Sequence, residues 1–566
     1  MNTNPITNKV ASLIALIACV VGLAISPVIN VDPINVPKLT LLFILTMAVV
    51  GIALSFPSLF FAQQNKVFFI AVSLFITQMV LVMIFSDAPL NQQLFGTFGR
   101  NTGFIAYLSL GFLSLVSLFA GSIFFSEKLI YAMLATGGLT TIYGILQTTG
   151  NDPIKWTNPY NNLIGFLGNP NFSSSFLGIS ATGAVAILLR RKISLLVRVS
   201  VLLFVIGALA LIIRSNSQQG ALVFAAGTFV VLSLFLIGTE FRMKKVFLGS
   251  FFTLGIIFGS AVVAGTLNQG PLGDVLYKLS VRQRGFYWNA AIEMMQSKPV
   301  FGVGLDSFGD WYFQLRSSNA ALLSPDAQSN AAHNIFLDMG ATGGFPLFFL
   351  YLFIMMFTLF ISIKYLYRNP TFNWGFAGLF GCWISYQAQA VISINQLGLG
   401  VWGWTMTGAL IGIEYKSRKN ESPVDNKSPT LNQSKRNSGK KSKGKISILN
   451  VGFGVVAGII ALLAILPFYT SDTSYRKSLD TRSAEQLVLA ATRSPIDTNR
   501  TLQAANILVN SKLPVPAKEL INKVLSENPR YYSAWKLLYE ISEESSPDKL
   551  RAANKLRELN PKVPIA

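Results

Sequence analysis

Long apolar stretches constrain the fold of this chain more than any other feature. A helix needs about 20 predominantly apolar residues to cross the hydrocarbon core of a bilayer. About thirteen stretches of this kind occur, at 10–30, 39–61, 67–86, 103–125, 129–149, 172–189, 197–213, 220–238, 246–266, 344–363, 372–394, 396–414 and 446–469. Only 13% of the residues are charged, against about a quarter in soluble domains. We therefore predict an all-α polytopic membrane protein with about 13 transmembrane helices.

The distribution of lysine and arginine predicts the orientation of these helices. Cytoplasmic loops carry an excess of both residues, and here basic loops alternate with loops that hold few positive charges. The basic loops contain Lys66, Lys128, Arg190 to Lys192 with Arg198, Arg242 to Lys245, Lys364 with Arg368, and the segment 415–445. We expect a cytoplasmic N-terminus, an outer C-terminus and a first apolar stretch that is retained as an anchor. The net charge of +21 then reflects topology, and we expect no nucleic-acid partner.

These assignments divide the chain into six parts. They are a first transmembrane bundle of about nine spans (1–266), a large outer loop (267–343), three further spans (344–414), a basic cytoplasmic linker (415–445), a last span (446–469) and an outer helical domain (470–566). The linker is rich in Ser, Asn and Lys, and we expect it to lie against anionic lipid at the inner (plasma) membrane surface.

The last part has the pattern of a helical repeat. Asn528-Pro529 and Asn560-Pro561 each follow a leucine-containing helical segment, with a spacing of 32 residues. This spacing is close to the 34-residue period of tetratricopeptide repeats. Paired helices of this kind bind a protein partner or stack on a neighbouring surface; a small helical cap without a partner remains the alternative.

The outer loop concentrates the residues that can perform chemistry. Arg284 and Trp288 are four residues apart, on one face of a helix predicted from about 282 to 297. Lys298-Pro299 ends that helix, and Gly302 and Gly304 predict a tight turn. Arginine binds phosphate as a planar bidentate donor, and aromatic rings stack on the apolar faces of sugars. The aromatic and basic residues of this region are Arg282, Arg284, Trp288, Trp311 and Tyr312; anchoring at the membrane interface is the alternative role for them.

Several motifs occur in an order that resembles one family. They are Arg284-x-x-x-Trp288, Lys298 to Gly304, His333-Asn334-x-x-Leu337 followed by Gly343-Gly344, a helix start after Arg100, and Asn169-Pro170-Asn171. Together they span roughly residues 90–410 and resemble the O-antigen ligase and polymerase superfamily. Members of this superfamily move glycans from polyprenyl-diphosphate carriers at the outer face of the cytoplasmic membrane. One motif departs from the family pattern, because the arginine expected beside Ser217 to Gly220 lies at Arg214 instead.

The resemblance implies roles for particular residues. Arg100, Arg214 and Arg284 are expected to stabilise the charge of the leaving diphosphate. His333, the only histidine of the chain, is expected to act as the general base or to orient the acceptor or the diphosphate. The residues expected to bind substrate are Arg100, Arg214, Arg282, Trp288, Asn334 and Asn169. For Asn169 the alternative is a helix-start role, and for His333 it is a helix cap or an interfacial ring.

We expect a single displacement with inversion at the anomeric carbon, without a metal or a cofactor. The two cysteines, Cys19 and Cys382, lie in apolar stretches, and the aspartates of the outer loop are scattered without ligand spacing. The donor would be a polyprenyl-diphosphate-linked glycan, and the acceptor a lipid, a wall polymer or a protein.

Three alternatives remain open. A polymerase would join repeat units while both stay on carriers. We favour a ligase, because an outer helical domain is suited to holding a distinct acceptor. The same domain can also bind a protein partner. A solute or bicarbonate transporter is less favoured, because it would carry paired ionisable residues within its helices. The third alternative is an inactive scaffold.

Overall fold

The computed structural model describes residues 5–156, 163–421, 447–481 and 483–563. Within these residues the chain is built from helices, and no strand occurs. Most of the predicted basic linker, from 422 to 446, lies outside the described residues. The all-α fold predicted from the sequence is therefore confirmed.

Ten of the described helices are long and apolar enough to cross a membrane. They are α1 (Pro5–Leu23), α2 (Asn35–Leu54), α4 (Lys66–Phe85), α7 (Ile123–Thr148), α8 (Pro170–Leu188), α9 (Leu195–Arg214), α10 (Gln218–Gly238), α11 (Lys244–Thr266), α16 (Ile335–Arg368) and α19 (Ile448–Thr481).

The other three predicted spans are also helices, but they do not meet the same criteria of length and hydropathy. They are α6 (Phe104–Ala120), α17 (Trp374–Ile392) and α18 (Leu397–Glu421). All three pack against other helices on most of their surface, and α6 lies along α18. A helix that is enclosed by protein does not contact lipid, so small and polar residues are tolerated there and lower its mean hydropathy. By these criteria the described residues contain ten candidate spans, whereas the sequence predicted about 13.

The remaining helices lie between the spans and in the C-terminal region. They are α3 (Pro57–Ala62), α5 (Leu90–Phe95), η1 (Gly165–Leu167), α12 (Gly273–Leu276), α13 (Leu279–Ser297), α14 (Phe308–Leu315), α15 (Ser318–Leu323), α20 (Ala484–Ala491), α21 (Thr498–Asn510), α22 (Pro514–Glu527), α23 (Tyr532–Ile541) and α24 (Pro547–Leu559). Helix α13 is the helix predicted at 282–297, and it begins three residues earlier.

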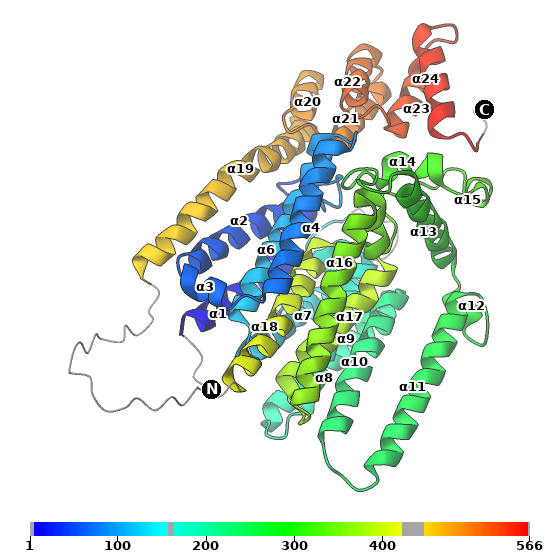
Figure 1. The fold of residues 1–566 in the computed structure, drawn as a ribbon. Coiled ribbons are helices and arrows are strands. Elements are labelled where there is room, and N and C mark those ends of the chain that lie inside the picture. Colours follow the sequence, from blue (N-terminus) through cyan, green and yellow to red (C-terminus); the bar gives the residue numbers. More distant parts are fainter. Residues whose placement is uncertain (1–4, 157–162, 422–446, 482, 564–566) are drawn as a thin grey trace.

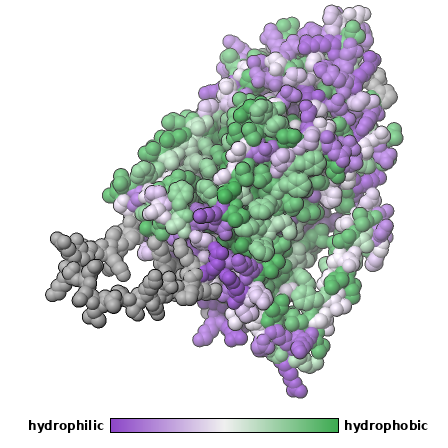
Figure 2. Space-filling view, in the orientation of Figure 1, coloured by the Kyte–Doolittle hydropathy of each residue, from purple (hydrophilic) through white to green (hydrophobic). Residues whose placement is uncertain are grey.

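The helices form two layers that are visible in Figure 1, a long bundle and a cap of short helices at one of its ends. Helices α13 to α15 and α20 to α24 lie at this end, and α19 runs beside α2 before it enters the cap. Figure 2 shows an apolar band over the bundle and a hydrophilic surface over the cap. This division is that of a membrane-embedded bundle with a solvated domain at one face.

Helix α16 is broken where the bundle meets the cap. Gly344 has φ of 74°, so two helical segments meet there at a kink. A break inside a membrane leaves backbone groups without partners unless other protein groups bind them. The segment from 299 to 304 supplies those partners: Val303 N–H donates to Ala341 O (2.9 Å), Gly304 N–H to Thr342 O (3.1 Å) and Phe345 N–H to Pro299 O (2.8 Å).

Lys38, within α2, is fully buried and has a set of structural partners. Its ammonium group donates to the carbonyls of Val21 (3.0 Å), Gly22 (2.9 Å) and Ala24 (2.8 Å). These carbonyls lie at the end of α1, where the helix leaves them without intrahelical partners. Lys38 therefore caps the C-terminal end of α1.

The C-terminal helices are docked on the outer loops. Asn528 donates to Gln92 Oε1 (3.3 Å), and Asn560 accepts from the guanidinium of Arg316 (3.2 Å). At the start of the domain, Asp472 accepts from the side chain of Asn30 (2.8 Å). The two Asn-Pro steps found in the sequence thus end α22 and α24, and both asparagines contact segments that lie between the candidate spans. The domain packs against other segments of its own chain; its likeness to a tetratricopeptide repeat stays a prediction.

Candidate active site

A cavity of about 500 Å³ lies between the outer loops and the C-terminal domain. His333 and Tyr287 line it from the membrane-proximal side, together with Gln92 and Thr97 of the loop around α5. Helix α21 and the residues before and within α23 close the opposite side. The cavity is therefore built from parts of the chain that are more than 400 residues apart, and its two walls meet because the C-terminal domain is docked.

His333 has an unusual backbone conformation at the start of α16. Its φ is +53°, a left-handed value that costs energy in residues with a side chain and is concentrated at functional positions. Its ring stacks on the ring of Tyr287, with 5.4 Å between centroids. Burial, and to a lesser extent the nearby cations Arg284 and Arg100, lower the pKa of His333 to about 3. The imidazole is therefore neutral at pH 7, the form in which it can accept a proton.

Arg284 belongs to α13 and lies close enough to His333 for its charge to lower the pKa of the imidazole. Burial lowers the pKa of Arg284 below the usual value. Its Nε, the Nε of Arg282 and the indole Nε1 of Trp288 are buried and have no hydrogen-bond partner within the described protein. Three buried donors without partners in two turns of one helix lower the stability of the fold unless a ligand accepts hydrogen bonds from them. This segment therefore provides hydrogen-bond donors for an anionic or hydroxyl-rich group.

Arg100 is held by two carboxylates and is almost completely buried. Its guanidinium lies 3.4 Å from Asp306 Oδ1 and 3.2 Å from Asp338 Oδ2, and it also donates to the carbonyl of Asn330. Burial lowers the pKa of Arg100, but the two carboxylates outweigh burial and raise it above the usual value. Because its charge is already compensated, Arg100 is suited to positioning the loops around His333 more than to binding a second anion.

The remaining predicted residues lie around this centre in different ways. Asn334 is the N-cap of α16, and its Oδ1 accepts from Leu337 N–H (3.1 Å). Asn169 is the N-cap of α8, as its alternative role proposed, and accepts from Asn171 N–H (2.8 Å). Arg214 ends α9 and donates to the carbonyl of Thr148 (3.4 Å) at the end of α7. The structure thus brings His333, Arg284 and Arg100 together, and gives Asn334, Asn169 and Arg214 local structural contacts.

The two aromatic residues considered as interfacial anchors are not alike. Tyr312 is only 1% exposed and lies in the core of the outer loop. Trp311 lies between two cations: the guanidinium of Arg530 is 3.5 Å from its ring centroid, and the ammonium of Lys298 is 5.4 Å away. Trp311 therefore connects the outer loop to the C-terminal domain.

Sequence reasoning missed several residues of the site. Tyr287 is one helical turn after Arg284, so the spacing could have indicated it. Asp306 and Asp338 are separated by 32 positions and gave no local signal, although both contact Arg100. Asp310 lines the cavity, and burial raises its pKa to about 6.

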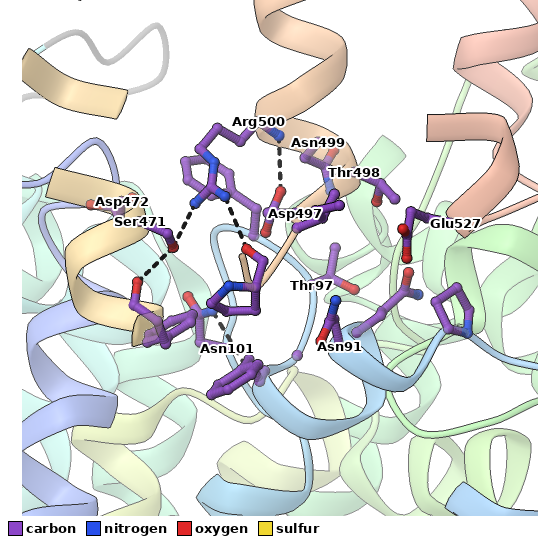
Figure 3. Close-up of a pocket in the computed structure, with 18 of the residues that line it drawn as sticks. Asn91, Thr97, Asn101, Ser471, Asp472, Asp497, Thr498, Asn499, Arg500 and Glu527 are labelled. Carbon is purple, nitrogen blue, oxygen red and sulfur yellow. Dashed lines mark hydrogen bonds between the residues drawn. The ribbon is translucent and has the colours of Figure 1, made fainter. Parts of the chain in front are cut away.

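A second, small cavity of about 30 Å³ adjoins the first (Figure 3). It lies where the loop around α5 meets the start of α21, and Thr97 and Asn499 line both cavities. Arg500 connects its walls by donating to Ser471 Oγ (3.0 Å) and to the carbonyl of Pro495 (3.0 Å). This cavity is too small for a sugar, and its hydrogen bonds instead hold α21 in place above His333.

Comparison with known proteins supports the family suggested by the motifs. Residues 202–352 match the family model described as O-antigen ligase. This segment contains Arg214, Arg284 and His333, and it ends within α16. A comparison with curated proteins gives no match. Over residues 202–352 the chain is therefore similar to the O-antigen ligase family.

Proposed function

We propose that this protein transfers a glycan from a polyprenyl-diphosphate carrier to an acceptor at the outer face of the cytoplasmic membrane. The observation that carries the proposal is the proximity of Arg284 to His333, whose side chain lines the cavity. The cavity lies at the polar end of the bundle, beside the membrane surface where a lipid-linked donor would present its diphosphate. The topology of basic loops supports assignment of this end to the outside.

The chemistry follows from the charges of the cluster. The acceptor hydroxyl oxygen attacks the anomeric carbon, the bond from that carbon to the phosphate oxygen breaks, and the electron pair leaves with the diphosphate. Negative charge grows on the leaving diphosphate, and fixed cationic donors stabilise it. Arg284 is the first candidate for this role, with Arg282 and Arg214 as further ligands of the phosphates. One displacement of this kind inverts the anomeric centre.

His333 is the candidate acceptor of the proton from the attacking hydroxyl. In the free protein its pKa is about 3, because burial and the neighbouring arginines disfavour the imidazolium ion. A bound diphosphate adds negative charge beside the same arginines and raises the pKa of His333. The base is thus kept neutral before the donor binds and becomes stronger when the donor is present. Tyr287 holds the ring by stacking.

We further propose that the acceptor is a lipid, a wall polymer or a protein, and that no metal takes part. Because the C-terminal domain closes the cavity opposite His333, an acceptor other than a second carrier can be held there. Polymerase activity, in which the acceptor is itself carrier-linked, is the second candidate. Addition of EDTA to the transfer reaction should leave its rate unchanged.

The proposal is tested in cells that accumulate the carrier-linked glycan. We expect wild type to move glycan to its acceptor and His333→Ala and Arg284→Ala to leave it on the carrier, as read by gel and mass spectrometry. Arg191→Ala, an exposed arginine between α8 and α9, is the matched control. Equal transfer by all four proteins, at equal membrane levels, would refute the proposal; the mass of the wild-type product separates ligase from polymerase.

A further inference from the structure

Three amide side chains of the C-terminal domain face the cavity that contains His333. They are Asn499, Gln503 and Asn506, which lie on α21 at spacings of four and three residues. Residues at these spacings lie on one face of a helix. Gln503 and Asn506 are exposed, and the hydroxyl of Tyr531 donates to Asn499 Oδ1. The domain therefore presents a row of uncharged donors and acceptors toward the proposed reaction centre.

The opposite wall is also rich in planar polar groups and rings. Gln92, Gln328 and Asn330 belong to the outer loops and line the same cavity. The rings of Phe98 and Tyr287 lie among them. Amides bind sugar hydroxyls because each amide both donates and accepts hydrogen bonds, and aromatic rings provide flat apolar surfaces.

The distribution of charge indicates which sugars fit. None of the described residues that line the cavity is a lysine or an arginine. Its carboxylates are Asp306, which is paired with Arg100, and Asp310, which accepts from Gln92 (2.9 Å). An acidic sugar would therefore find no lysine or arginine among the described residues that line the cavity. The charges of Arg284 and Arg100 act on His333, which lies at the end of the cavity where the diphosphate is proposed to bind.

We propose that the face of α21 carrying Asn499, Gln503 and Asn506 is a binding subsite for an uncharged, hydroxyl-rich glycan segment. The inference rests on the proposed function, and it assigns a specificity role to the C-terminal domain. The segment can belong to the donor or to a carbohydrate acceptor, because both present the same hydroxyl chemistry. In either case the sugars nearest the reacting bond lie at His333 and those further along the chain contact α21.

The first test measures binding without turnover. The probe is the oligosaccharide released by mild acid from the carrier lipid of cells that express His333→Ala, and its binding to full-length protein in lipid nanodiscs is measured by saturation-transfer NMR. We expect the double variant Gln503→Ala/Asn506→Ala to weaken binding at least fivefold. The control is Asn522→Ala, an exposed amide on the neighbouring helix α22, which should bind as wild type. Binding within twofold of wild type in the double variant would overturn the inference.

The second test separates the two sources of the glycan by steady-state kinetics. A raised KM for the carrier-linked donor, with kcat retained, assigns the subsite to the donor glycan; a raised KM for the acceptor assigns it to the acceptor. A lowered kcat with both KM values unchanged would contradict a binding role. Gln503→Tyr adds bulk at an exposed position and should raise the same KM by blocking the subsite. Agreement between this variant and the alanine pair would show that the raised KM does not come from a local structural change caused by the alanines.

Failure of this inference is distinguishable from failure of the proposed function. Loss of probe binding in the double variant, with no transfer by wild type, would retain the glycan subsite and reject the transferase. Transfer by wild type that depends on His333, with unchanged probe binding and unchanged KM values in the double variant, would retain the transferase and reject the subsite.

Discussion

At the scale of single residues, the surroundings of His333 decide how the site responds to pH. Arg284 and Arg100 disfavour a third positive charge, and burial acts in the same direction. Asp310 in the same cavity is affected oppositely, because burial disfavours its anion and raises its pKa to about 6. The group of this cavity that titrates nearest to neutrality is therefore a carboxyl group and not the imidazole.

This difference predicts the pH profile of kcat/KM, which reports the free enzyme. Between pH 8 and pH 5 His333 stays neutral, so its protonation should not reduce kcat/KM. We expect an inflection near pH 6 that disappears in Asp310→Asn. An inflection near pH 6 that persists in Asp310→Asn would show that His333 titrates there and contradict the assignment.

Protonation should also affect stability, with a defined sign. The pKa of His333 is lower in the folded protein than the usual value of about 6.5, so the unfolded chain binds more protons between these values. The free energy of unfolding therefore falls as pH decreases from about 6.5 toward 3. His333→Gln should lose less stability than wild type over this window, as measured by thermal unfolding of protein in nanodiscs. Identical pH dependence of the two melting temperatures would contradict the folded-state pKa.

Individual residues also show the limits of the sequence. The motif spacings led to His333 and Arg284, because both belong to patterns that resemble the superfamily. They did not reveal that Arg100 is neutralised by Asp306 and Asp338, since neither aspartate lies near Arg100 in the chain. A direct phosphate role for Arg100 stays a prediction, and its burial favours a positioning role.

At the scale of elements, the break in α16 orients the site. The helical segment before Gly344 carries Asp338, and it begins directly after His333. The segment at 299–304 packs backbone against backbone on this break, which requires residues without side chains. A Cβ on Gly344 would lie 2.6 Å from the carbonyl oxygen of Pro299, and a Cβ on Gly302 would lie 2.5 Å from the backbone of Gly343.

Gly344→Ala should therefore destabilise the protein and reduce transfer. The left-handed backbone alone costs about 1–3 kcal/mol in a residue with a side chain, and the clash with Pro299 adds to this cost. We expect a lower melting temperature and a lower level in membranes. Gly138→Ala, within α7, is the matched control because an added Cβ there meets no atom within 4 Å. Equal melting temperatures for the two variants would contradict this account of the kink.

The elements themselves were largely predictable from the sequence. The helix beginning near Arg284 and the turn at Gly302 and Gly304 follow from local signals. The place where this turn packs does not, because its partners in α16 are about 40 residues away and no periodic pattern links them. Helices α6, α17 and α18 were found as apolar stretches, but their enclosure by other helices became clear only from their burial.

At the scale of the whole molecule, the C-terminal domain is part of the site. The contacts of Asn528 with Gln92 and of Asn560 with Arg316 connect the C-terminal domain to the outer loops. The sequence predicted a helical domain on the same side as the large loop. It could not predict that the domain closes the cavity, because side chains separated by hundreds of residues leave no pattern in one sequence.

The topology predicts which surfaces a membrane-impermeant thiol reagent can reach. In a background without Cys19 and Cys382, Ser511→Cys lies in an exposed turn of the C-terminal domain and Arg191→Cys in the exposed loop between α8 and α9. We expect a reagent that is excluded by the cytoplasmic membrane to label Ser511→Cys in cells or spheroplasts, and Arg191→Cys only after that membrane is permeabilised. The reverse pattern would place the cavity on the cytoplasmic side, where a donor at the outer face could not reach it.

The most direct test of the central claim is turnover by purified full-length protein in nanodiscs, supplied with extracted carrier-linked glycan and a membrane extract as the acceptor source. We predict that wild type and Arg191→Ala release polyprenyl diphosphate in equal amount to the glycan transferred. His333→Ala and Arg284→Ala should each slow this release by about 100-fold or more while they keep the wild-type melting temperature. Release at the wild-type rate by both variants would contradict a transferase site at His333.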